Sequence, residues 1–451
     1  MAVTGKLALR LGRRRLMIMS IIGFVALSCV CGVVGTLDAM VAARFLQGLF
    51  AAPLIPLSQA TIVDAYPVAE RSRGLSIWAM GVILGPALGP ALGGLLTQHI
   101  HWRMCFFVNV PIGAVALLLC VYFVRPTERL KIRIDWTGLM LAAALVVPLQ
   151  IALDQGDEQD WLSSKLIVML FAVAALAGAA FVVRGLIVKN NILPLRLFAD
   201  RNFALSTLAI ACLGIVLFAQ TTLSPVMLED LLGWQVDTAG LVMGVFGIGG
   251  FIGATISPYL VRWIGSRASI VLGAFVVVLG QFLGLGLNLD MSPWQAPIPG
   301  FFAVLGIMIA YVPTTGLAFA NVPIAERDDA AAEYNFVKTI GFVKTIGFVK
   351  TIGFVKTIEL SIGVSLVSTL LYGRPQFHTN VLISHVRVDN EALRQFVHAL
   401  GADEWNARVA TVVAKTVGAQ ATMLAVLDVF FVMIGVAAIV AVLAALTRRA
   451  R

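Results

Sequence analysis

The chain has 451 residues, of which 59% are hydrophobic and only 13% are charged, and its mean hydropathy is +0.93. Soluble proteins contain about 45–50% apolar and about 25% charged residues, so this composition excludes an ordinary soluble domain. The net charge of +9 does not indicate a nucleic-acid partner, because the Lys and Arg residues lie in short stretches between apolar runs.

Apolar runs of about 20 residues, the length that crosses a bilayer, predict about twelve transmembrane helices. The basic stretches between them alternate along the chain, so the positive-inside rule predicts that both termini are cytoplasmic. The acidic segment 154–160 then faces outward. The predicted spans are 16–36, 39–60, 75–96, 104–123, 136–153, 166–183, 203–226, 238–260, 268–287, 301–320, 355–371 and 421–446.

A basic segment precedes the first of these spans. Its glycines permit a sharp reversal of the chain, so we expect a tight loop at the cytoplasmic face. The residues of this predicted loop that we single out are Gly5, Arg10, Gly12, Arg13 and Arg14.

The second span contains Arg44, a few residues inside its apolar run, with Gln47 one turn further on. An arginine at this depth is costly unless it finds a partner or water. Arg44 is therefore a candidate for a functional role, with Gln47 lining the same cavity. The alternative is an arginine that extends to the membrane interface.

Glycines recur every four residues in the third span, and two prolines interrupt the same run. On a helix this spacing places the glycines on one slowly drifting face, where a neighbouring backbone can approach closely. Prolines in a bilayer are tolerated where other helices or a water-filled cavity satisfy the freed backbone groups. The helix is expected to pack tightly or to line a cavity. The residues of this glycine stripe are Gly81, Gly85, Pro86, Gly89, Pro90, Gly93 and Gly94.

Other polar residues also fall within predicted spans. We interpret Asn109 as an interhelical hydrogen bond in preference to a substrate ligand, and Gln150 and Gln220 as cavity or packing residues. Asp428 is a carboxylate clearly inside the last span and hence a candidate proton site. The favoured alternative is an aspartate near the outer surface.

The segment 336–358 repeats the hexapeptide Phe-Val-Lys-Thr-Ile-Gly, which suggests a tandem expansion of about 18 residues. A helix of 18 residues makes five whole turns, so the expansion keeps the helical phase. We expect the last copy to enter the membrane and the earlier copies to project into the cytoplasm. An over-long membrane helix is the alternative.

The segment 373–420 is long and polar and is expected to face outward. It is predicted to be either amphipathic helices, with a surface for a periplasmic partner, or a plain solvated loop. The histidines are predicted to lie in outward loops, and their spacing indicates no metal site.

Taken together, these motifs resemble the major facilitator superfamily and, within it, the fourteen-span drug:proton antiporter branch of EmrB/QacA-like exporters. The resemblance also includes the Asn-Val-Pro-Ile-Gly run that begins at Asn109, the Asp-Trp-Thr-Gly run that begins at Asp135, and residues 201–203 and 361–363. It implies that the basic segment is the family's cytoplasmic loop motif. It also implies that Arg44 and Gln47 belong to a proton-linked motif and that the glycine stripe is the antiporter motif.

Two departures from the pattern matter. The family's basic loop carries an aspartate where this chain has Leu9, and that loop normally follows the second span, whereas here it begins at residue 5. Two spans with the acidic partner of Arg44 would then be missing. We expect either an upstream start or a truncated chain.

The resemblance implies an all-α polytopic membrane protein with the major facilitator fold. An incomplete N-terminal bundle (1–134), two linker spans (135–202) and a C-terminal six-helix bundle (203–451) are expected. The expected function is proton-coupled efflux of amphipathic drugs or other small molecules across the bacterial inner membrane, and the alternative is a truncated, non-transporting remnant or regulatory subunit. The expected partners are the substrate, protons, the bilayer and a periplasmic adaptor. No enzyme activity, cofactor or nucleic acid is expected, and a nucleotide-driven pump is disfavoured because the chain has no Gly-x-x-x-x-Gly-Lys-Ser/Thr loop.

Overall fold

The computed structural model describes residues 4–67, 70–127, 135–156, 159, 161–187, 201–319, 356–386, 391–399 and 407–447. Within these ranges the chain is helical and contains no strand. Nine of the described helical segments are long and apolar enough to cross a membrane. The predicted all-α polytopic membrane fold is therefore confirmed.

Most helices in the N-terminal part of the chain pack around α2 (Arg13–Val33), whereas α5 (Arg71–His99) packs mainly against α11 (Val236–Gly284). These helices are α1 (Thr4–Leu11), α2 (Arg13–Val33), α3 (Leu37–Ala51), α4 (Leu54–Ala65), α5 (Arg71–His99), α6 (Met104–Phe107) and α7 (Asn109–Phe123). Helix α2 packs against α3, α4, α6 and α7, and α4 packs against α5. The predicted span 39–60 is divided at Pro53 into α3 and α4.

The expected tight basic loop is largely a helix. Residues 4–11 form α1, and the reversal falls on the single residue Gly12, which separates α1 from α2. Gly12 has a φ of 87°, in the left-handed region that glycine adopts without steric cost. One glycine therefore accomplishes the turn, and Gly5 lies inside the helix.

The two predicted linker spans form the antiparallel helices α8 (Trp136–Gln155) and α9 (Lys165–Ile187), with the short 3-10 helix η2 (Trp161–Ser163) between them. The Asp135 side chain caps α8 by accepting a hydrogen bond from the Gly138 backbone N–H at 2.9 Å. It also pairs with Arg184 near the end of α9, at 2.7 Å from its Nη2 atom. One carboxylate thus fixes the start of α8 and joins it to α9.

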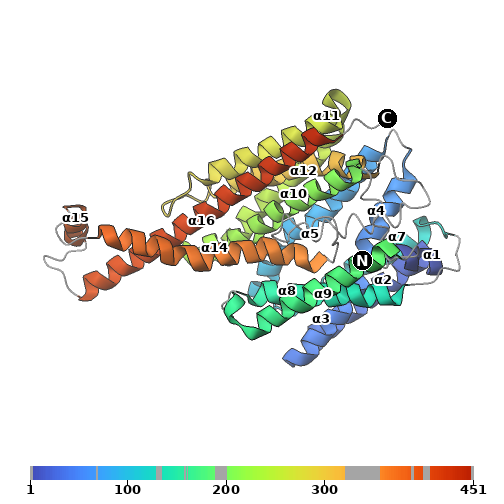
Figure 1. Ribbon diagram of the computed structural model, residues 1–451, viewed down its shortest axis with the longest axis horizontal. Coiled ribbons are helices and arrows are strands. Elements are labelled where there is room, and N and C mark those ends of the chain that lie inside the picture. The colour runs from blue at the N-terminus through green and yellow to red at the C-terminus, as the bar shows by residue number, and fades with distance from the viewer. Residues whose placement is uncertain are drawn as a thin grey trace.

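The C-terminal part contains the largest hydrophobic core. It comprises α10 (Arg201–Pro225), the π-helix η4 (Val226–Leu231), α11 (Val236–Gly284), α12 (Pro297–Phe319), α14 (Lys356–His385), α15 (Glu391–Ala399) and α16 (Ala407–Leu446). Figure 1 shows α10, α11, α12 and α16 running side by side. Helix α11 is a hairpin of two helices, because Gly265 breaks it with a φ of 82°. This break separates the predicted spans 238–260 and 268–287.

The last two long helices extend further than the sequence indicates. We expected spans at 355–371 and 421–446, but α14 continues through Pro375 to His385, and α16 begins at Ala407. With α15 they reach out beyond the rest of the bundle, as Figure 1 shows. The described part of segment 373–420 is therefore helical and not a plain loop. Most of the hexapeptide repeat lies outside the described residues, and α14 begins within its fourth copy.

Candidate functional site in the membrane helices

Arg44 lies on α3 and is held by a polar and an aromatic contact. Its Nη1 atom donates a hydrogen bond to Gln47 Oε1 at 3.1 Å, one turn along the same helix. Its guanidinium carbon lies 4.5 Å from the centre of the Phe106 ring, which is a cation–π arrangement. No acidic side chain in the described part of the chain forms an ion pair with Arg44.

The surroundings of Gln47 are apolar. Its side chain is buried, with the residue only 3% exposed, and it lies on the same helix as Ala43, which packs with Cys31 and Phe106. The Gln47 Nε2 atom finds no hydrogen-bond partner among the described residues. A buried donor without an acceptor is costly. Gln47 therefore presents a buried donor without a partner one turn along α3 from Arg44, which is itself exposed.

Asn109 is linked through Ser28 to Phe106, the residue that covers Arg44, and it connects two helices. Its Nδ2 atom donates to Ser28 Oγ at 3.0 Å, and Ser28 Oγ donates in turn to the Phe106 carbonyl at 3.0 Å. The chain of bonds joins α2 to the junction of α6 and α7. It also holds the backbone of Phe106, the residue whose ring covers Arg44. Asn109 thus acts through helix packing in this structure.

The glycine stripe of α5 does not make the close helix contact that we considered. A Cβ atom added at Gly81, Gly85, Gly89 or Gly93 would have no described atom within 4 Å, and one added at Gly94 would lie 3.6 Å from Val236. The first three glycines are exposed. The alternative expectation, that this helix lines a cavity, stays a prediction. Pro86 and Pro90 lie within the same helix.

Close contacts between glycines and the backbone of a facing helix lie instead between α11 and α12, where sequence reasoning did not place them. An added Cβ at Gly273 would be 2.6 Å from the Gly306 carbonyl oxygen, and one at Gly306 would be 2.5 Å from the Gly273 carbonyl oxygen. Gly249 and Gly280 make similar approaches to Phe301 and Ala303. Such backbone contact is what small residues permit between membrane helices.

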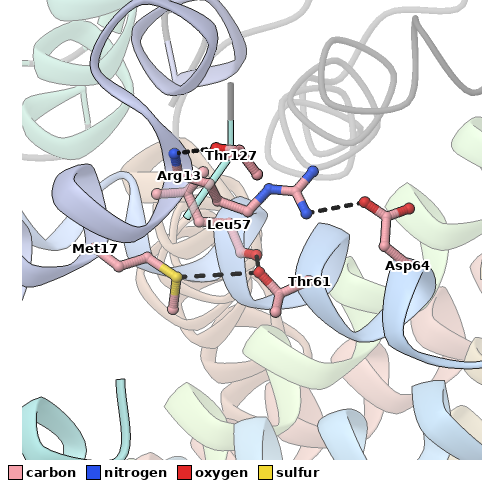
Figure 2. A network of polar contacts seen from close by, with 6 residues as sticks. All are labelled: Arg13, Met17, Leu57, Thr61, Asp64 and Thr127. Atoms are coloured by element: carbon pink, nitrogen blue, oxygen red, sulfur yellow. Dashed lines mark hydrogen bonds and ion pairs between the residues drawn. The ribbon is translucent and has the colours of Figure 1, made fainter. Parts of the chain in front are cut away.

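In the basic segment, Arg13 is fixed at both its backbone and its side chain, as Figure 2 shows. Its backbone N–H donates to Thr127 Oγ1 at 2.9 Å, and its Nη1 atom pairs with Asp64 at the end of α4, also at 2.9 Å. Arg14 donates to the Val121 carbonyl at 2.5 Å, whereas Arg10 is exposed. Sequence reasoning did not identify Asp64 as the partner of this segment.

Asp428 also has partners that sequence reasoning missed. Its Oδ2 atom lies 2.7 Å from Arg374 Nε and 2.8 Å from His378 Nε2. Both partners belong to α14, four residues apart on one face. The expectation that His378 lies in an outward loop is therefore wrong. The spacing of four residues between Arg374 and His378 could have indicated a shared helix face. The sequence did not predict that α14 extends this far.

The remaining candidates pack inside the C-terminal part. Gln220 accepts a hydrogen bond from Gln281 Nε2 at 3.4 Å and donates from its own Nε2 to Ser224 at 3.4 Å. The two glutamines are buried and join α10 to α11. Gln150 is half-buried on α8. Among the described residues, no group of His, Cys, Asp and Glu side chains has the arrangement of a metal site.

Comparison with known proteins places this arrangement of helices in a family. Residues 1–343 match the Major Facilitator Superfamily. The chain belongs to this family. It is a multi-pass membrane protein and a transporter, not an enzyme.

The relatives of this facilitator include exporters. The chain is 31% identical over 447 residues to the multidrug export protein EmrB of Escherichia coli K12, an alignment that covers 96% of this chain and 82% of that protein. It is 29% identical over 389 residues to the fatty acid resistance protein FarB of Neisseria gonorrhoeae, covering 85% of this chain and 73% of that protein.

Solved structures agree at the level of the fold. The human organic anion transporter MFSD10 superimposes with a TM-score of 0.56 at 15% identity, covering 97% of this chain and 79% of the other. The proton:xylose symporter XylE superimposes with a TM-score of 0.51 at 15% identity, covering 94% and 81%. At these identities the comparison shows a shared facilitator fold.

Proposed function

We propose that this protein exports amphipathic small molecules across the bacterial inner membrane and that inward proton flow drives the export. The observation that carries the proposal is the similarity to a multidrug export protein over 96% of the chain. The name of the FarB relative adds fatty acids, which are amphipathic, to the chemistry of the relatives. Both termini would then be cytoplasmic, as the distribution of Lys and Arg indicates.

Arg44 and Gln47 are the proposed proton-coupling residues of the N-terminal bundle. The support is their geometry: the buried Gln47 amide has a donor without a partner, and its Oε1 atom accepts from the exposed Arg44 guanidinium, which lies over the Phe106 ring. A carboxylate or an anionic substrate group would satisfy these donors. In a rocking facilitator the two bundles move around a midplane cavity, and the open glycine face of α5 would line it.

Export is tested by expressing the chain in an efflux-deficient bacterial host and following the loss of preloaded ethidium. We expect efflux that a protonophore abolishes, and we expect Arg44→Gln to remove it. The matched control is Arg262→Gln, which neutralises an exposed arginine on α11 far along the chain from Arg44. Correct insertion without any ethidium efflux would instead favour a non-transporting remnant.

An adaptor protein is proposed to dock on the hairpin of α14, α15 and α16. This hairpin extends beyond the bundle in Figure 1. Its tip is ordered by a small apolar cluster that contains Val397, Val409 and Val413. Deleting α15 should abolish co-purification of a periplasmic adaptor and leave membrane insertion intact. Unchanged co-purification would refute this proposal.

A further inference from the structure

Asp428, His378 and Arg374 form a charged cluster between two helices far from Arg44 in the sequence. One carboxylate oxygen, Asp428 Oδ2, accepts from both Arg374 Nε and His378 Nε2. The side chain of His378 is 16% exposed and that of Asp428 is 27% exposed, so neighbouring protein atoms cover most of both groups but do not enclose them. The Phe377 ring lies against both basic partners, 5.2 Å from the Arg374 guanidinium and 5.5 Å from the His378 ring.

The hydrogen bond defines which atom of His378 is free. An ionised carboxylate only accepts hydrogen bonds, so Nε2 must carry the hydrogen that it shares with Asp428. In the neutral ring, Nδ1 is then the unprotonated nitrogen. A proton that binds at Nδ1 converts the imidazole to an imidazolium and breaks no bond of the cluster.

Protonation of His378 changes the net charge of the cluster and thereby the strength of the contact between α14 and α16. With neutral His378, the Arg374 cation and the Asp428 anion cancel. Protonation adds one positive charge and turns the His378–Asp428 hydrogen bond, which the ionised carboxylate already makes charge-assisted, into an ion pair between opposite charges, so the contact becomes stronger. Because His378 and Arg374 lie on α14 and Asp428 lies on α16, the added strength acts between these two helices.

From this geometry we propose that the cluster is a proton-binding site of the carrier, in which a proton at His378 Nδ1 clamps α14 against α16. Histidine suits this role because it is the side chain that ordinarily changes charge between about pH 5 and 8. The clamp is closed in acid and loosens as the pH rises. The proposal rests on the proposed proton-driven export, because it assigns a site to the driving ion.

Charged groups on the neighbouring elements are few. Arg374 and Asp428 face His378 directly. Of the elements packed against α14 and α16, α10 carries only Arg201, at its first residue. The remaining groups on these elements are Asp154 on α8, Glu229 and Asp230 on η4, Asp237, Arg262 and Arg267 on α11, Lys356, Glu359 and His385 on α14 itself, and Arg408 and Lys415 on α16 itself. All of them stay in place in the variants below.

Hydrogen–deuterium exchange of the full chain in lipid nanodiscs tests the clamp without requiring transport. After correction for the intrinsic effect of pH, peptides covering residues 374–386 should exchange roughly fivefold more slowly at about pH 5.5 than at about pH 7.5. His378→Gln keeps a neutral donor and should abolish this difference. His378→Lys is charged at both pH values and should exchange slowly at both. His99→Gln, at an exposed histidine on α5, should behave like the wild type.

Two results would overturn the proposal. The first is equal corrected exchange at both pH values in the wild type. The second is a pH difference that survives in His378→Gln. Ethidium transport into acid-loaded proteoliposomes then links the clamp to the carrier, because His378→Gln should flatten the pH profile of transport. An unchanged profile would remove the cluster from the proton path. A wild type that transports no ethidium would refute the proposed function, while the exchange experiment would still decide the clamp.

Discussion

Replacing Gly273 with alanine tests the packing of α11 on α12. The added Cβ would lie 2.6 Å from the Gly306 carbonyl oxygen and 2.6 Å from the Ala310 backbone nitrogen. Ordinary van der Waals contact begins at 3.4 Å, so the two backbones must separate by about 0.8 Å, the difference between 3.4 and 2.6 Å. Neither contact atom belongs to a flexible side chain that could move aside.

The expected cost of this separation is that of an overpacked core, about 1–3 kcal/mol. Exchanging glycine for alanine inside a helix also contributes a gain of roughly 0.5–1 kcal/mol. Gly244→Ala isolates the steric cost, because Gly244 lies inside the other helix of α11 and an added Cβ there meets no described atom within 4 Å. The propensity gain is common to both variants, so their difference is the overpacking cost.

Thermal unfolding in detergent, followed by intrinsic fluorescence and by size-exclusion recovery, measures this difference. We expect Gly273→Ala to unfold at a clearly lower temperature than Gly244→Ala, whereas Gly244→Ala should match or slightly exceed the wild type. Equal melting of the two variants would mean that α11 and α12 do not approach at Gly273 as the structure has them, and the argument would fail.

The remaining predictions concern polar contacts, and the same unfolding assay measures them. Asp135→Ala should destabilise the protein by about 1 kcal/mol more than Asp135→Asn, because asparagine still caps α8; equal losses would show that the cap contributes nothing. Ser28→Ala should cost about 0.6–2 kcal/mol by leaving Asn109 Nδ2 without its acceptor, and a neutral outcome would mean that this bond is replaced. Asp64→Asn should lower the free energy of unfolding by at most about 1 kcal/mol, since the Asp64 side chain is 38% exposed. The double variant that swaps the two residues, Arg13→Asp with Asp64→Arg, should regain this stability. If the swapped variant does not regain stability, Arg13 contributes through its hydrogen-bond geometry and not through its charge.

Hydropathy determined which stretches of this chain enter a membrane, because every spanning backbone must bury its polar groups inside a helix coated by apolar side chains. The positions of α2, α8, α9, α10 and α12 follow from that rule alone. The ends of the helices were harder to predict from the sequence. The polar segment after residue 372 continues α14, where Arg374 pairs with Asp428, and α16 begins at Ala407, where Val409 and Val413 pack with Val397 of α15.

Periodicity also identified which residues share a face of one helix, but it carried no information on what that face meets. The regular stripe on α5 meets open space, whereas the less regular glycines of α11 and α12 touch backbone to backbone. Likewise Asp428 was visible as a carboxylate in a span, and only the tertiary structure placed Arg374 and His378 against it. Local chemistry sets the helices and their faces, and the choice of neighbour depends on how all the helices pack together, which no single segment encodes.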